Sequence, residues 1–98
     1  MNIIENIPFS SEKPAVLSVR KTDKINIIAI GLLEKQVLKK HKTSIPSLLV
    51  VLQGKILFRI DNETIVLNQF ETYQIPVNVE HEAEGVDEKN CFMLTQEK

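Results

Sequence analysis

Two histidines, His41 and His81, are the residues of this sequence best suited to chemistry. An imidazole ionises near neutral pH and is the commonest metal ligand among side chains. Each histidine lies in a short segment with charged neighbours, "KKHKT" at 39–43 and "EHEAE" at 80–84. Alternate side chains of a strand point to opposite faces, and the flanking lysines and glutamates predict solvated faces. Both histidines are therefore expected to face the interior.

Other reactive groups give weaker signals. Cys91 is the one cysteine, so no disulfide can form within the chain, and its apolar segment "NCFMLT" predicts a buried strand residue. The sequence has no HExxH helix, no glycine-rich phosphate loop and no recognisable nucleophile motif. Glu80, Glu82 and Glu84 are interpreted as a solvated strand face and not as an acid–base pair. We therefore expect no catalytic residue from motif alone.

Charge and hydropathy exclude two classes of partner. The chain has 12 basic and 13 acidic residues, for a net charge of -1, so no polyanion-binding surface is indicated and we expect no nucleic-acid binding. No apolar run approaches the roughly 18 residues of a membrane span, and no signal peptide is evident. A cytoplasmic protein without a membrane partner is expected. Four lysines at 35, 39, 40 and 42 either attract an anionic partner or protect an edge strand from unwanted pairing.

The 98 residues predict one domain, residues 1–98, with an all-β fold of antiparallel strands. The segment "KILFRIDNETIVL" predicts a hairpin, because its apolar residues alternate and Asn62 tolerates positive φ in the turn. A short helix within "IGLLEKQVLKK" is the alternative to a strand there. The expected strands span residues 16–20, 24–33, 36–40, 48–53, 55–61, 64–67, 72–75, 81–83 and 91–95.

Apolar surface also predicts a homodimer. In "LLVVL" both faces of one strand are apolar, which is typical of a strand covered on both sides. The amino-terminal segment 1–14 adds further apolar residues, and we expect it to pack on a dimer partner.

Two groups of residues resemble the motifs of the cupin family, over residues 27–94 or so. The first cupin motif runs from a glycine through His-x-His and an acid to a second glycine, and the second motif is glycine, Pro-x-Gly and histidine. The corresponding positions here are Lys35, His41, Thr43, Ser47 and Gly54, then Phe70, Pro76, Asn78 and His81.

This resemblance implies a cupin-like double-stranded β-helix, that is, a jelly-roll barrel. It also implies a degenerate metal site, because Thr43 and Ser47 replace the second histidine and the carboxylate. His41 and His81 would then be the only protein ligands of a divalent transition metal such as Zn, Ni, Fe or Mn. The predicted cavity is lined by His41, Thr43, Ser47, Gln53, Tyr73 and His81.

Three classes of function remain open. The first is a non-enzymatic protein that holds a small ligand in its barrel or acts as a sensor. The second is a metal-dependent enzyme of oxygenase or isomerase type that uses His41 and His81. The third is a structural or interaction module with a barrel filled by side chains.

Overall fold

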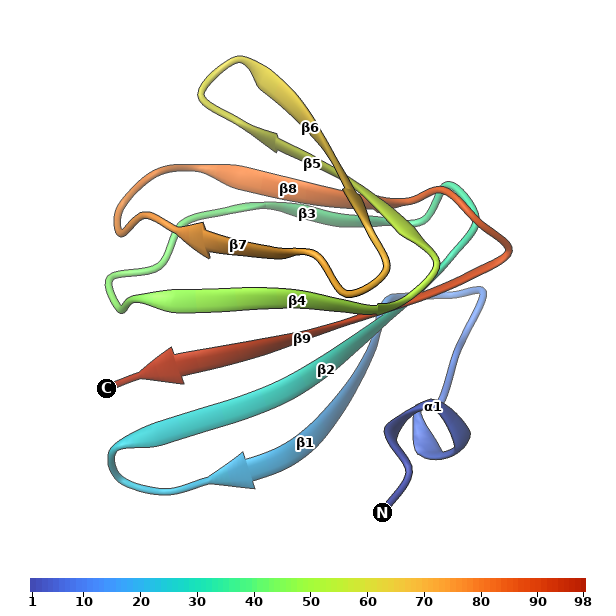
Figure 1. Ribbon diagram of the computed structural model, residues 1–98, viewed down its shortest axis with the longest axis horizontal. Helices are drawn as coiled ribbons and strands as arrows, with labels where there is room; N and C mark the ends of the chain where they lie inside the picture. Colours follow the sequence, from blue (N-terminus) through green and yellow to red (C-terminus); the bar gives the residue numbers. More distant parts are fainter.

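A computed structural model describes residues 1–98 and shows two facing antiparallel β-sheets (Figure 1). One sheet has five strands in the order β1-β2-β9-β4-β7, and the other has four in the order β3-β8-β5-β6. The elements are α1 (Ile3–Asn6), β1 (Ala15–Lys21), β2 (Ile25–Leu33), β3 (Val37–His41), β4 (Ser47–Gln53), β5 (Lys55–Ile60), β6 (Glu63–Asn68), β7 (Thr72–Ile75), β8 (His81–Gly85) and β9 (Lys89–Glu97). The prediction of an antiparallel all-β jelly roll is confirmed.

All nine predicted strands are present, with ends displaced by a few residues. The predicted hairpin is β5–β6, whose two-residue turn places Asp61 and Asn62 at φ 52° and 62°. Positive φ at both central residues is the conformation that matches the right-handed twist of paired strands. The helix considered within 30–40 does not form, because β2 and β3 are joined by a turn with Lys35 at φ 66°. No helix of the chain is long and apolar enough to cross a membrane.

The main core lies between the two sheets and fills the barrel. Leu49, Val51, Ile56, Phe58 and Phe92 are each at most 1% exposed, and they come from three strands, one in the four-stranded sheet and two in the five-stranded sheet. Strand alternation explains why these residues are buried, since the even residues of β5 and the odd residues of β4 point inward. The barrel interior is therefore closed by aliphatic and aromatic packing.

A second cluster lies on the outer face of the five-stranded sheet. Ile7 from the amino-terminal segment packs there with Ala15, Ala29 and Cys91. A Cβ on Gly31 would lie 2.9 Å from Cδ1 of Ile7, so glycine lets this side chain lie close to the sheet. The amino-terminal segment thus covers part of its own sheet, and its expected packing on a dimer partner stays a prediction.

The buried side chain of Asn90 joins the elements at one end of the barrel, which we call the Asn90 end. Its Oδ1 accepts hydrogen bonds from the N–H groups of Lys55 (2.9 Å) and Asp87 (3.0 Å). Its Nδ2 donates to the carbonyl oxygens of Leu32 (3.0 Å) and Asp87 (2.9 Å). Because Leu32 and Lys55 belong to different sheets, one amide connects both. The opposite end, with the β5–β6 turn and the histidines, is called the mouth.

We predict that Leu49→Ala lowers the free energy of unfolding by about 2 to 5 kcal/mol, because it leaves a cavity at a fully buried position. Val66→Ala is the matched control, since Val66 is 49% exposed on the outer face of the other sheet. Urea denaturation at neutral pH measures both changes. Equal changes in the two variants would contradict the assignment of Leu49 to the core.

Candidate functional site

The two histidines meet at the mouth of the barrel. β3 and β8 are neighbours, and His41 pairs directly with His81. The ring centroids are 4.3 Å apart with an interplanar angle of 63°. His81 is buried, whereas His41 is exposed and not interior as expected, because it is the last residue of β3. The predicted approach of the two rings is confirmed, but it occurs at the mouth.

A β-bulge in β3 produces this pairing. Leu38 pairs with Ala83 and His41 with His81, so three steps along β3 match two steps along β8. Without the extra residue, simple alternation from Leu38 would direct Lys40 toward His81. Bulges are a common way to redirect a side chain beside a functional site. The bulge therefore determines that an imidazole, and not an ammonium group, faces the second ring.

Backbone hydrogen bonds fix the tautomer of both rings. Nδ1 of His41 is 2.9 Å from the carbonyl oxygen of Lys39, and Nδ1 of His81 is 2.9 Å from that of Val79. A carbonyl oxygen only accepts, so Nδ1 carries the proton and a neutral ring has its lone pair on Nε2. Burial lowers the pKa of His81 below its usual value, the hydrogen bond to Val79 opposes this, and His41 adds a smaller lowering. His81 is accordingly neutral at physiological pH, with Nε2 free to accept.

The side chains of Thr43 and Ser47, which were predicted to line the cavity, form hydrogen bonds within the chain instead. Oγ1 of Thr43 accepts from the N–H of Ile45 at 3.3 Å. Oγ of Ser47 donates to the carbonyl oxygen of Ile45 at 3.4 Å and accepts from Nε2 of Gln96 at 3.5 Å. Both residues thus serve the turn before β4 and its junction with β9.

Tyr73 and Gln53 also differ from the expected lining. Tyr73 packs against Phe58 in the core, with ring centroids 5.1 Å apart. Gln53 ends β4 at the Asn90 end, opposite Cys91 in β9, about 20 Å along the strand from Ser47. Gln53 therefore cannot join the histidines in one site, because equal strand parity places residues on one face but not at one depth.

The barrel interior has no room for a ligand. Phe58 fills the space below the histidines, and its ring stacks on His81 with centroids 5.4 Å apart. The void that remains between the histidines and the core is about 10 Å³, which is at most the space of one water molecule. The expected ligand cavity of six residues is not formed.

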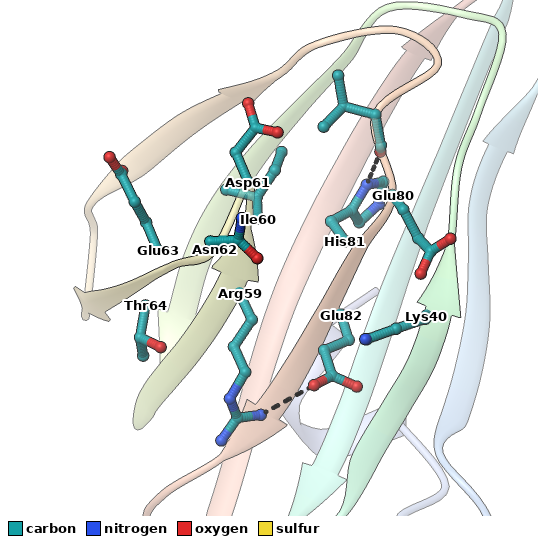
Figure 2. A pocket seen from close by; sticks show the side chains of 11 residues that line it. Lys40, Arg59, Ile60, Asp61, Asn62, Glu63, Thr64, Glu80, His81 and Glu82 are labelled. Carbon is teal, nitrogen blue, oxygen red and sulfur yellow. Dashed lines mark hydrogen bonds and ion pairs between the residues drawn. The ribbon is translucent and has the colours of Figure 1, made fainter.

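An open groove lies instead outside the mouth, with a volume of about 530 Å³. Figure 2 shows how its side chains come from the end of β3, the β5–β6 hairpin and the start of β8. The lining residues are Lys40, Arg59, Ile60, Asp61, Asn62, Glu63, Thr64, Val79, Glu80, His81 and Glu82. His81 is one of these lining residues, so the histidine pair and the groove lie next to each other at the mouth.

Arg59 is a groove residue that sequence reasoning missed. Its guanidinium contacts Glu82 at 3.4 Å and Glu84 at 2.8 Å on the neighbouring strand β8. The hydrogen bond to Glu84 is the main reason that the pKa of Arg59 is raised. Two of the three glutamates interpreted as a solvated face are therefore paired with a cation. The sequence did contain a signal for its position. Arg59 lies between Phe58 and Ile60, which face inward, so alternation places Arg59 on the outer face of the sheet.

The donor set does not fit a resident metal ion. No three histidine, cysteine, aspartate or glutamate side chains lie close enough together to hold one. Protein sites for transition metals generally use three or four side-chain ligands. Only the two imidazoles converge here.

We predict that the free energy of unfolding decreases as the pH falls below about 6.5. The folded-state pKa of His81 is depressed below the usual 6.5, so its contribution to stability is present above that pH and is lost as the pH falls through the folded-state pKa. The slope from this one group is at most about 1.4 kcal/mol per pH unit. Urea melts at pH 7.5 and 5.5 measure it, and His81→Phe should show a smaller decrease. An equal decrease in this variant would show that other groups cause it.

Comparisons with known proteins give a fold and no closer relationship. No family model and no curated protein matches the sequence. Among solved structures, an RmlC-like cupin protein from Desulfovibrio desulfuricans aligns with a TM-score of 0.88 and 19% identity, over 99% of this chain and 93% of that one. A protein with a double-stranded β-helix domain from Klebsiella pneumoniae gives 0.90 and 14%, over 99% and 87%.

KdgF from Halomonas sp. is a third similar structure, with a TM-score of 0.85 and 14% identity over 100% of this chain and 91% of that one. Agreement of this quality along nearly complete chains, at identities of no more than 19%, is agreement of backbone architecture. We conclude that this chain has the cupin fold, a double-stranded β-helix of antiparallel strands.

Proposed function

We propose that the protein is a non-catalytic binding module that holds a small ligand in the groove at the mouth of its barrel. The observation that carries this proposal is the state of His81. Its ring is buried and its Nδ1 is bonded to Val79, and it lines a groove of about 530 Å³. Because Nδ1 already donates, Nε2 of the neutral ring keeps its lone pair as an acceptor for a ligand N–H or O–H. Binding outside the barrel also agrees with its filled interior.

The reactive groups of the chain favour binding over catalysis. The thiol of Cys91 is buried, and burial raises its pKa to about 11, so little thiolate is present at neutral pH. Cys91 also lies in the second cluster, on the outer face of the five-stranded sheet. Thr64 is the one hydroxyl side chain that lines the groove. Neither residue is paired with an imidazole in the way that an activated nucleophile requires.

The metal-dependent enzyme is the alternative. It is favoured only by the two carbonyl-bonded Nδ1 atoms, since this arrangement also orients the imidazoles of metal sites. The chain supplies two convergent donors and no third. We therefore expect any zinc or nickel binding to be weak and to depend on His41.

The test is ¹⁵N NMR of the histidine rings at pH 7.5 during separate titrations with glycerol, lactate, 1,4-diaminobutane and zinc. We expect at least one organic probe to shift Nε2 of His81 saturably, and zinc to bind without a stoichiometric end point. His41→Ala should abolish the response to zinc. Failure of all organic probes to shift Nε2 would refute the binding proposal, and stoichiometric zinc lost in His41→Ala would replace it with the metal site.

We also propose that two copies of the chain pair through the outer face of the five-stranded sheet. Val50 lies opposite Met93 there, and Leu48, which is 41% exposed, lies in the same cross-strand row as Ile27. The amino-terminal segment covers the part of this face around Ile7 but not this part. A second copy would remove the remaining apolar side chains from water.

Light scattering at tens of micromolar protein should give twice the 11.2 kDa mass of one chain. Leu48→Lys should lower the measured mass, because a charge would be buried at the contact. Val66→Lys is the control on the other sheet and should leave the mass unchanged. A monomeric mass for the wild type would contradict the proposal.

A further inference from the structure

Phe70 is an exposed aromatic residue in a backbone conformation that favours glycine. It lies between β6 and β7 with φ 69°, and it is 73% exposed. A bulky residue in the left-handed region is strained, and a large apolar side chain in water adds a second free-energy cost. Two unfavourable features at one residue indicate a contact with another molecule.

The turn that carries Phe70 is fixed against β4. The N–H of Phe70 donates to the carbonyl oxygen of Val51 at 2.6 Å, and Nε2 of Gln69 donates to that of Leu52 at 3.2 Å. A group that is already ordered loses little conformational entropy when it binds. The turn therefore presents the Phe70 ring at a defined place on the surface.

The five-stranded sheet has a covered side and an uncovered side, separated by its middle strand β9. β1 and β2 lie on one side of β9, and β4 and β7 lie on the other. The amino-terminal segment with α1 lies on the β1–β2 side (Figure 1), where Ile7 lies over Gly31, the residue that pairs with Cys91 of β9. On the other side of β9, Gln53 pairs with the same Cys91, and Phe70 is bonded to β4 two residues before Gln53. The amino-terminal segment and Phe70 are thus at the same level of the sheet, on opposite sides of β9.

A two-fold axis parallel to β9 would bring these two sides together. Most small oligomers are dimers with a two-fold axis, in which the same surface of both copies forms the contact. A segment that protrudes from one sheet prevents face-to-face packing unless it lies over an uncovered part of the other sheet. An axis parallel to β9 exchanges the two sides and keeps the level, so α1 of each copy would lie over β4, β7 and Phe70 of the other.

α1 has an apolar residue available for this contact. Ile3 packs against the second cluster of its own chain, whereas Ile4 is 36% exposed. Because a helix has 3.6 residues per turn, Ile4 is directed away from the side that Ile3 buries. Ile4 and Phe70 are thus exposed apolar side chains on the two surfaces that this axis brings together.

We propose that α1 of each copy docks on the β6–β7 turn of a second copy, with Ile4 against Phe70, so that the dimer contains this contact twice. The inference rests on the proposed pairing of two copies through the five-stranded sheet and names the segments that meet at its edges. Burial of the Phe70 ring in the dimer would offset the cost of its exposure in the single chain.

The first test is the dimer dissociation constant of Phe70→Gly, measured by sedimentation velocity. Loss of the buried ring should raise this constant by about tenfold or more. Because glycine favours φ 69°, the variant should unfold at no lower temperature than the wild type in solutions dilute enough to keep both monomeric. A purely structural role for Phe70 would instead lower the unfolding temperature and leave the dissociation constant unchanged. Val66→Ala, on the outer face of the other sheet, is the control and should not change the dissociation constant.

The second test joins the two segments covalently. In the double variant Ile4→Cys with Phe70→Cys, a short bifunctional thiol reagent should yield a covalent dimer on a denaturing gel. The buried thiol of Cys91 should contribute little to the reaction. Each single variant should yield no covalent dimer, since the axis keeps the two copies of either residue on opposite sides of the interface. Ile4→Cys with Val66→Cys is the matched control and should also yield none.

Three outcomes would contradict the inference. A wild-type dimer whose dissociation constant is unchanged by Phe70→Gly, and which gives no covalent product in the double variant, would overturn it and leave the proposed pairing standing. A covalent dimer from Ile4→Cys alone would show a different axis and would also overturn it. A monomeric wild type at tens of micromolar would refute both this contact and the pairing.

Discussion

The side chain of Asn90 is the interaction on which the architecture most depends. Four hydrogen bonds from one buried amide connect β2, the start of β5 and the β8–β9 turn, and therefore both sheets. Two of the three glycines are explained by it. A Cβ on Gly54, which has φ 78°, would collide with Oδ1 of Asn90, and one on Gly85 would lie 2.6 Å from Nδ2. Such a fully satisfied polar group specifies one arrangement of the strands, because every alternative leaves buried groups unpaired.

The strands at the mouth are held less tightly than those at the Asn90 end. At the mouth, β3 ends and β8 begins without a buried side chain like Asn90 to join them. The bulge in β3 brings the ring of His41 against that of His81. Phe58 below them fills the space in which a cavity was expected. A filled barrel needs no ligand for its stability, and a small ligand would have to bind at the surface. The filled interior thus agrees with a structural or interaction module. The groove at the mouth agrees with a module that holds a small ligand.

The fold could be predicted much further than the site. Inward positions of His81, Leu49 and Phe58 follow from alternation along single strands, and so does the solvent side of Glu82. The ion pair of Arg59 with Glu82 could not be read in this way, because it depends on the register between β5 and β8, which are separated by two other strands in the chain. Asn90 was missed for a similar reason, since its partners lie up to 58 positions away.

The sequence by itself determined the strands, the β5–β6 turn and the face of each strand that is apolar, because these are properties of neighbouring residues. Tertiary structure alone decided that His41 is exposed at the mouth, that Phe58 occupies the interior, that Gln53 lies at the opposite end and that Ile7 covers its own sheet. Each of these depends on a register shift or on the volume left between two sheets. Alternation fixes the direction of a side chain, but only packing between distant strands fixes its depth and its neighbours.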